Sequence, residues 1–330
     1  MGIKKLKITF ITCLIFIFSA LAVGCSKSTS TNSDEKSNKD HKTRTISTAM
    51  GKVEVPTNPK RIVVNYFQGD LLALGVKPLA MSRMEGDIAI KNELKGVKIV
   101  EKWEPEEIMA LKPDLIIVIS EEEYKKYNKI APTIFVPFTK LSSEERLTLI
   151  AEVVGKQEEA KKVINNFKNK VETSKKKLKT AGVMDKSFTL LEQDKKEIMV
   201  LGGNKWGGRG GEIVYDYLGL KAPNVVKKEI INGGDQYKNV SLEAFPEYSG
   251  DYIIQAVWNY GEDNLKDNNV WVNLPEVKEN RVIKTDGNLF YYMDLYSMDK
   301  QLDYIVNAIL KTTGRDIKWK NYCHYFVQYL

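Results

Sequence analysis

The stretch of this chain with the most distinctive chemistry is a glycine-rich loop, LGGNKWGGRGGE, at residues 201–212. Its six glycines give the backbone conformations closed to other residues and leave Trp206 and Arg209 uncovered. Trp206 offers a flat apolar face, and Arg209 offers a planar, forked donor for carboxylate, hydroxamate or other oxyanions. The loop also leads into a predicted helix N-terminus, which favours anions. We therefore predict a ligand-binding loop; the alternative is a surface loop whose Trp and Arg are incidental.

Further aromatic residues and an arginine follow other predicted strands. Residues beyond the carboxyl ends of parallel strands line the ligand crevice of α/β sheets. Taken singly, each such residue is more often a packing residue, but together they predict an aromatic cleft with a few cations. Such a cleft suits a bulky, oxygen-rich ligand that is anionic or neutral. The residues expected to contact this ligand, besides the loop, are Tyr66, Arg83, Trp258, Tyr291 and Tyr292.

Several kinds of catalytic and metal site are absent from the sequence. The chain has two histidines, His41 and His324, and both lie outside the expected folded body. That body therefore lacks a His-rich metal site and a Ser-His-Asp or Cys-His catalytic group. No GxxxxGK[ST] phosphate-binding loop is present. We expect no catalytic residue, no metal ligand and no cofactor, and hence a binding protein rather than an enzyme.

A long amphipathic helix, predicted over residues 157–181, organises the rest of the chain. Apolar residues recur along it at helical spacing, no Gly or Pro interrupts it, and about 25 residues would span roughly 37 Å. Strand-rich segments of comparable length lie on either side. We therefore predict two lobes joined by one helix; the alternative is an ordinary surface helix of one larger domain.

Strands alternate with helices on both sides of this helix, which predicts an α/β fold with two Rossmann-like lobes. Before the long helix, the expected strands cover residues 61–64, 79–81, 97–100, 115–119 and 134–136, and the expected helices 69–74, 88–94, 104–111, 121–130 and 143–154. After it, the expected strands cover residues 188–192, 198–201, 252–257 and 281–283, and the expected helices 212–218, 242–245 and 298–311. The first lobe is predicted to hold a parallel sheet with helices on both faces.

The N-terminus has the pattern of an exported lipoprotein. A short basic start precedes an uncharged apolar run at residues 8–23, and a Ser/Thr/Lys/Asp-rich stretch follows Cys25. The sequence LAVGC resembles a lipobox, in which the cysteine is lipidated; the alternative is an uncleaved membrane anchor. Besides Cys25, only Cys13 and Cys323 are present, so no disulfide is expected within the folded body.

The net charge of +7 is concentrated at the two ends of the chain. Residues 1–45 carry eight Lys/Arg against three Asp/Glu, and residues 311–330 carry four against one, so the intervening body is close to neutral. This distribution gives no basic domain and argues against nucleic-acid binding. We expect a signal peptide (1–24), lipidated cysteine and tether (25–45), N-terminal lobe (46–142), connecting helices (143–181), C-terminal lobe (182–311) and an aromatic tail (312–330).

Several segments resemble the substrate-binding lipoproteins of bacterial ferric-siderophore ABC importers. They are VEVPTNPKRIVV, EEIMALKPDLIIVI, KIAPTIFVPF and WVNLPEVKENRVIKTD, and the likeness covers about residues 45–311. The segment KWGGRGGEIVYDYLGLKAP is similar to the Trp/Arg loop of the iron–hydroxamate-binding proteins of Gram-positive bacteria. The resemblance implies the helical-backbone periplasmic-binding-protein fold, with Trp206 and Arg209 contacting the iron complex. Here two glycines separate these two residues.

The same resemblance implies a function and partners. The expected protein is a monomer, lipid-anchored on the outer face of a Gram-positive-type cell membrane. It would bind a pre-chelated Fe(III)–siderophore and deliver it to the permease of an ABC importer. Glu106 and Glu243 correspond to the family's carboxylates that dock on permease arginines.

The sequence is compatible with several ligands. Hydroxamate or citrate–hydroxamate complexes come first, while ferric citrate or a ferric catecholate would suit Arg83 and Arg209 if the ligand is more anionic. Haem or a cobalamin on the same fold is a further alternative, although the folded body offers no histidine for haem. An exported esterase would need a nucleophile–base pair, and we find none.

Overall fold

The computed structural model describes residues 43–83, 88–193, 197–203, 208–258 and 265–314. The predicted signal peptide, Cys25, Trp206, both histidines and nearly all of the expected tether and tail lie outside these residues. Within the described part of the chain, no helix has the length and apolar character needed to cross a membrane.

The N-terminal lobe is built on a parallel sheet with the strand order β5-β4-β3-β6-β7, which confirms the predicted parallel arrangement. The interior strand β6 is buried along its whole length, as expected for a strand covered on both faces. The strands are β3 (Ile62–Val64), β4 (Ala80–Ser82), β5 (Lys98–Val100), β6 (Leu115–Val118) and β7 (Thr133–Phe135). The helices of this lobe are α1 (Gln68–Ala73), α2 (Pro105–Ala110), α3 (Glu121–Tyr127) and the short 3-10 helix η1 (Phe138–Lys140).

The helix expected at residues 88–94 is wrong, because this segment forms a series of turns. The amide of Glu93 donates to the carbonyl of Ile90 (3.1 Å) and that of Lys95 to Asn92 (3.4 Å), both only three residues back. The segment ends at Gly96, whose φ of +82° suits a residue without a Cβ atom. Ile90 and Leu94 are nevertheless buried, so the apolar spacing marks packing residues without a regular helix.

An antiparallel hairpin, β1 (Thr43–Thr48) and β2 (Gly51–Pro56), precedes this lobe and was not predicted. The sequence places the end of the tether at residue 45, but β1 already begins at Thr43. Arg44 joins the hairpin to the body, since its guanidinium donates to the carbonyls of Thr57 (2.7 Å) and Val153 (2.6 Å).

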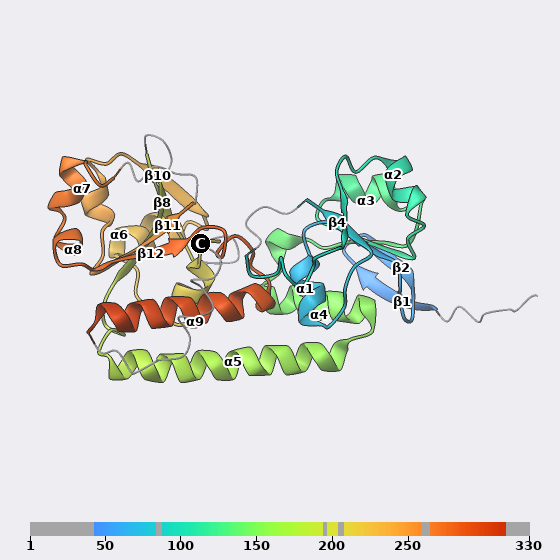
Figure 1. Ribbon diagram of the computed structural model, residues 1–330, viewed down its shortest axis with the longest axis horizontal. Helices are drawn as coiled ribbons and strands as arrows, with labels where there is room; N and C mark the ends of the chain where they lie inside the picture. Colours follow the sequence, from blue (N-terminus) through green and yellow to red (C-terminus); the bar gives the residue numbers. More distant parts are fainter. Residues whose placement is uncertain (1–42, 84–87, 194–196, 204–207, 259–264, 315–330) are drawn as a thin grey trace, which may run out of the picture. The chain divides into compact units, whose positions relative to one another are not determined.

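Two consecutive helices, α4 (Ser143–Val154) and α5 (Gln157–Thr180), connect the lobes as predicted. A capping box at Ser142 begins α4, and Gly155, with a φ of +74°, ends it. The 24-residue α5 buries a stripe of apolar side chains and packs against α4 and α9 (Leu295–Thr312). Figure 1 shows α5 running alongside both helices.

The C-terminal lobe has a mixed sheet with the order β10-β9-β8-β11-β12. Strands β8, β11 and β12 are parallel to one another, whereas β9 runs antiparallel to both of its neighbours, β8 and β10. Consecutive strands that are also neighbours, such as β8 and β9, can be joined by a short turn, and this makes them antiparallel. These strands are β8 (Phe188–Gln193), β9 (Ile198–Leu201), β10 (Tyr237–Val240), β11 (Tyr252–Val257) and β12 (Val282–Asp286). Together with the other lobe and α5, this sheet confirms the predicted class of two α/β lobes joined by a long helix.

Short helices cover this second sheet. The helix expected at residues 242–245 forms as turns followed by the 3-10 helix η4, whose second residue is Pro246. The strand β10 and the helical turns from Asn224 and Asn269 onward were not predicted. Besides α9, the helical segments are η2 (Glu212–Tyr217), α6 (Asn224–Val226), η3 (Lys227–Ile231), η4 (Phe245–Tyr248), α7 (Asn269–Asn273) and α8 (Pro275–Lys278).

A buried polar group ties segments from both lobes to α4. The guanidinium of Arg146 pairs with Asp70 of α1 (3.1 Å) and donates to the carbonyl of Met293 (2.6 Å), and the side chains of Arg146 and Asp70 are each 2% exposed. Ser143 Oγ lies 2.9 Å from a carboxylate oxygen of Glu212 and 2.8 Å from the Met293 carbonyl. One hydroxyl donates one hydrogen bond, so both contacts are satisfied when Glu212 is protonated and donates to Ser143. Burial indeed raises the pKa of Glu212 to about 7.

We expect Arg146→Met to destabilise the protein strongly. The substitution leaves the Asp70 carboxylate buried without its cation, and breaking such a buried pair costs about 3–5 kcal/mol. Urea unfolding of the purified protein measures this loss. As a control, Lys168→Met removes the pair with Glu144, in which the lysine is 54% exposed, and should cost no more than about 1 kcal/mol. Equal effects of the two substitutions would contradict the assigned role of Arg146.

We expect Glu212→Gln to change how stability depends on pH. The native pKa of Glu212 lies above its ordinary value, so protonation contributes stability that is present in acid and is lost as the pH rises through about 7. The glutamine variant should therefore gain about 2 kcal/mol relative to the parent between pH 5 and pH 8. Urea unfolding at several pH values tests this, with the exposed Glu106→Gln as control. A pH-independent difference would show that Glu212 is ionised in the folded protein.

Candidate functional site

Four of the predicted contact residues come together in one row of aromatic rings. Tyr66 follows β3, Trp258 follows β11, and Tyr291 and Tyr292 follow β12 by a short turn. The ring centroids are 6.1 Å apart for Trp258–Tyr291, 4.9 Å for Tyr291–Tyr292 and 5.2 Å for Tyr292–Tyr66. Phe138 extends the row, 5.0 Å beyond Tyr66. Rings that follow strands of both sheets thus form one continuous group, which we call the aromatic row.

A hydrogen bond and burial hold Tyr66 at its place in this row despite a strained backbone. Its φ of +75° lies in the left-handed region, which residues other than glycine seldom adopt. Its amide donates to Ser82 Oγ (3.3 Å), and burial raises the pKa of its phenol, so the hydroxyl stays protonated. Its neighbour in the row, Tyr292, receives a hydrogen bond at its hydroxyl from the amide of Gln68 (3.3 Å).

Arg209 is fixed at the end of the glycine-rich loop. Its own φ is +52°, and its backbone N–H donates to the carbonyl of Phe290 (3.0 Å). Gly210 is required here, because its φ is +92° and a Cβ atom would lie 3.0 Å from Ile305 and 3.1 Å from Phe290. The sequence thus positions this arginine through its backbone, next to the residues that precede the tyrosines of the row.

The guanidinium of Arg209 lies against the aromatic row. Its central carbon is 5.0 Å from the ring centre of Trp258 and 5.5 Å from that of Tyr291, distances typical of cation–π contacts. Its Nε donates to Glu192 Oε2 (2.6 Å), while Trp258 Nε1 donates to Glu192 Oε1 (2.7 Å). Gly287 allows this arrangement, since a Cβ atom there would lie 2.7 Å from the indole. A single carboxylate therefore orients both side chains.

Glu192 was not among the predicted site residues. It lies near the carboxyl end of β8, which is the positional signal that identified Trp258 after β11. Applying that rule to carboxylates as well as to aromatic and cationic residues would have found it. We call Glu192, Arg209, Trp258 and Tyr291 the arginine cluster.

The other predicted cation, Arg83, is engaged with Glu101. Its Nε donates to Glu101 Oε2 (3.0 Å), and its side chain is 65% exposed. Arg83 is joined to the aromatic row through the chain, because the preceding Ser82 accepts the hydrogen bond from Tyr66. The structure thus places Arg83 after β4, at the carboxyl end of the first sheet, as the sequence predicts.

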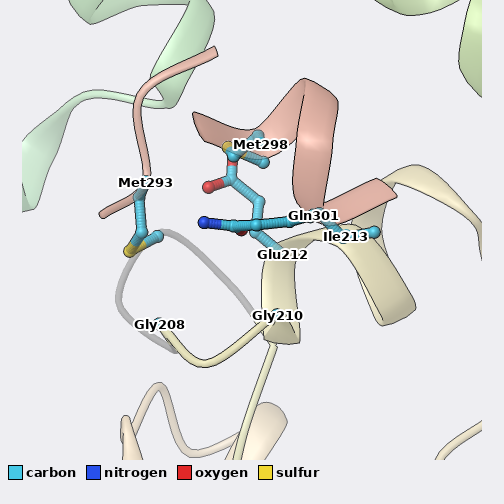
Figure 2. Close-up of a pocket in the computed structure, with 7 residues that line it drawn as sticks. All are labelled: Gly208, Gly210, Glu212, Ile213, Met293, Met298 and Gln301. Atoms are coloured by element: carbon cyan, nitrogen blue, oxygen red, sulfur yellow. The ribbon is translucent and has the colours of Figure 1, made fainter. Parts of the chain in front are cut away.

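A small pocket lies under the glycine-rich loop, and Figure 2 shows its lining. Its volume is about 10 Å³, roughly the space that one water molecule needs. Gln301 closes one side and donates to the carbonyls of Leu289 (2.8 Å) and Tyr292 (2.7 Å). The lining residues are Gly208, Gly210, Glu212, Ile213, Met293, Met298 and Gln301. This hollow is far below the roughly 300 Å³ of the smallest ligand pockets, so it does not form a ligand-binding site by itself.

The two predicted docking carboxylates are solvent-exposed. Glu106 lies in the first turn of α2, and Glu243 lies in the turn that precedes η4. Hydrogen bonds from its own backbone N–H and from Ser241 lower the pKa of Glu243, so this carboxylate is ionised at neutral pH. Nowhere in the described ranges do three His, Cys, Asp or Glu side chains gather closely enough to hold a metal ion.

Comparison with known proteins agrees with this architecture. The chain is 37% identical over 316 residues to the iron(3+)-hydroxamate-binding protein YxeB of Bacillus subtilis, covering 92% of this chain and 96% of that one. The fold matches FhuD of Staphylococcus pseudintermedius with a TM-score of 0.72 at 29% identity, covering 82% of this chain and 98% of that chain. It also matches Staphylococcus aureus FhuD2 with bound ferrioxamine B, with a TM-score of 0.70 at 26% identity, covering 77% and 100%.

The family model for periplasmic binding proteins matches residues 68–289. This span runs from α1 to the turn after β12, and so contains the whole second sheet, four of the five strands of the first sheet and the helices between them; β3 lies just before it. With the identity to YxeB over nearly the full length, the match shows that the chain belongs to the periplasmic binding protein family.

Proposed function

We propose that this protein binds an Fe(III)–siderophore complex outside the cell membrane and delivers it to the permease of an ABC importer. The cargo is of the hydroxamate or citrate–hydroxamate type. The observation that carries this proposal is the joining of the arginine cluster to the aromatic row, in a chain whose relatives are named for binding iron(3+)-hydroxamates. Flat rings offer apolar contact to the ligand shell of the complex, and a guanidinium donates to its oxygens.

Each site residue has a role in this proposal. Trp206 and Arg209 contact the iron complex from the glycine-rich loop, and Arg83 approaches it from the other sheet. The aromatic row supplies the remaining contact surface through Tyr66, Trp258, Tyr291 and Tyr292. The iron arrives already chelated, so the protein contributes neither a metal ligand nor a catalytic group.

Delivery requires anchoring and docking. Cys25 carries the lipid that holds the protein, as a monomer, at the outer face of the membrane. Glu106 and Glu243 meet arginines of the permease, one carboxylate from each lobe. The exposure of both carboxylates supports this role, because an ion pair with a partner needs side chains at the surface.

We expect Trp206→Ala and Arg209→Ala each to weaken ferrioxamine B binding by about 1–3 kcal/mol, as for the loss of a buried anchor. Isothermal titration calorimetry with the ferric and the iron-free ligand measures the change. Lys221→Ala, which removes a surface pair with Asp185 in the same lobe, is the matched control and should leave the affinity unchanged. Unchanged affinity in both loop variants would place the site elsewhere. Saturable binding of haem or a cobalamin, with no response to any ferric siderophore, would reassign the cargo.

We expect Glu106→Ala combined with Glu243→Ala to abolish siderophore-dependent iron uptake in cells and to leave ligand affinity intact. The reason is that both carboxylates are exposed and act only in docking. The matched control is Glu121→Ala with Glu247→Ala, which removes one exposed carboxylate from each lobe at neighbouring helices. Equal loss of uptake in the control pair, or loss of ligand affinity in the test pair, would contradict the docking assignment.

A further inference from the structure

Glu192 occupies a position from which one carboxylate controls the charge of the proposed binding surface. Its two oxygens receive different donors, Arg209 Nε at 2.6 Å and Trp258 Nε1 at 2.7 Å. The side chain of Glu192 is 16% exposed and that of Arg209 is 26% exposed, so solvent screens this ion pair only in part. Arg209 therefore lies against the aromatic row with its positive charge already compensated.

We infer that Glu192 is a specificity-determining residue: by neutralising Arg209, it makes the site select ferric complexes without net negative charge over anionic ferric carboxylates. This inference rests on the proposed function and deepens it. In a ferric hydroxamate, one hydroxamate anion balances each positive charge of Fe(III), so the complex is uncharged, or cationic if the chain ends in an ammonium. A ferric citrate complex keeps an excess of carboxylates and is anionic.

The geometry explains how Glu192 disfavours anionic ligands and still lets Arg209 bind uncharged ones. Arginine presents five N–H donors in a fixed fork, and the pair with Glu192 uses the one on Nε. Further donors of the guanidinium serve to recognise uncharged hydroxamate oxygens. An anionic ligand at the same place would meet the Glu192 carboxylate close behind the guanidinium, and the repulsion between the two would offset the attraction to Arg209.

The second predicted site cation, Arg83, is also paired with a carboxylate. Arg83 is paired with Glu101, so each of the two predicted site cations carries its own counter-charge. The two pairs differ in solvation, because the Arg83 pair is more than half exposed and the Arg209 pair is mostly buried. Screening weakens the exposed pair, so Glu192 is the carboxylate whose removal should alter selectivity.

The test is the change in ligand preference on Glu192→Gln. Glutamine keeps the size of the side chain, but its single carbonyl oxygen serves one of the two donors and its charge is lost. Affinities for ferrioxamine B (cationic), ferrichrome (uncharged) and ferric citrate (anionic) are measured by calorimetry on the full chain. We expect the ratio of the citrate Kd to the ferrioxamine Kd to fall at least tenfold, and ferric citrate binding to become sensitive to salt.

Three further variants separate charge from structure. Glu192→Asp keeps the charge and should keep the preference even if all affinities fall. Asp185→Asn removes one exposed negative charge from the same lobe and should change nothing. Arg209→Gln retains the Glu192 charge without its partner, so the preference for ferrioxamine B over ferrichrome should grow. This last variant also tests the inference if Glu192→Gln fails to fold.

The possible outcomes are distinct. If Glu192→Gln weakens all three ligands by the same factor, the carboxylate only holds its neighbours in place, and the inference is overturned while the proposed function stands. The same holds if the parent protein binds ferric citrate as tightly as ferrioxamine B. If the folded parent protein binds no ferric siderophore, both the inference and the proposed function are overturned.

Discussion

The buried guanidinium of Arg146 is the interaction on which much of the structure depends. It lies on α4 and joins Asp70 of α1 to the backbone of Met293, so segments from both lobes meet on one side chain. Burial alone would make an isolated charge there prohibitively costly, which is why it is surrounded by carboxylates. Asp294, immediately after Met293, fits close to α1 because Gly69 has no Cβ atom, which would otherwise lie 2.2 Å from its carboxylate.

Hydrogen bonds connect the proposed binding surface to the buried polar residues around Arg146. Glu212, which contacts Ser143 of α4, begins the helix directly after the glycine-rich loop, so it fixes the loop end that carries Arg209. The side-chain amide of Gln301 donates a hydrogen bond to the carbonyl of Tyr292. This bond fixes the backbone at the point where the tyrosines of the aromatic row are followed by Met293. A change in the spacing of α1, α4 and α9 would thus move Arg209 and the aromatic row together, which couples the stability of the lobe junction to the geometry of the proposed site.

The sequence predicts those elements of the fold that have a local pattern of apolar residues, and it misses those that depend on tertiary contacts. Uninterrupted apolar runs and long helical periodicity are local properties, so β6, β11, α4 and α5 have nearly the predicted bounds. The hairpin β1–β2 has few buried residues, chiefly Ile46 and Val55, and its burial depends on contacts with distant α4, as the bond from Arg44 to Val153 shows. Turns with buried apolar residues at helical spacing also imitate a helix, as at residues 88–94, where Ala89, Ile90 and Leu94 are buried. Such elements are decided by tertiary packing, which local patterns do not contain.

Local sequence patterns also miss the tertiary contacts of the site, and these contacts determine how much positive charge its arginines present. The rule that ligands lie beyond strand ends correctly grouped Tyr66 with Trp258, Tyr291 and Tyr292, because it depends on topology. Two arginines in that set suggest an anionic ligand only if their charges are available. The pairing of Arg209 with Glu192 links residues 17 positions apart, and that of Arg83 with Glu101 links residues 18 apart, so neither is visible as a local pattern. Counting cations in a sequence therefore overestimates the positive potential of a site unless the carboxylates that pair with them are counted as well.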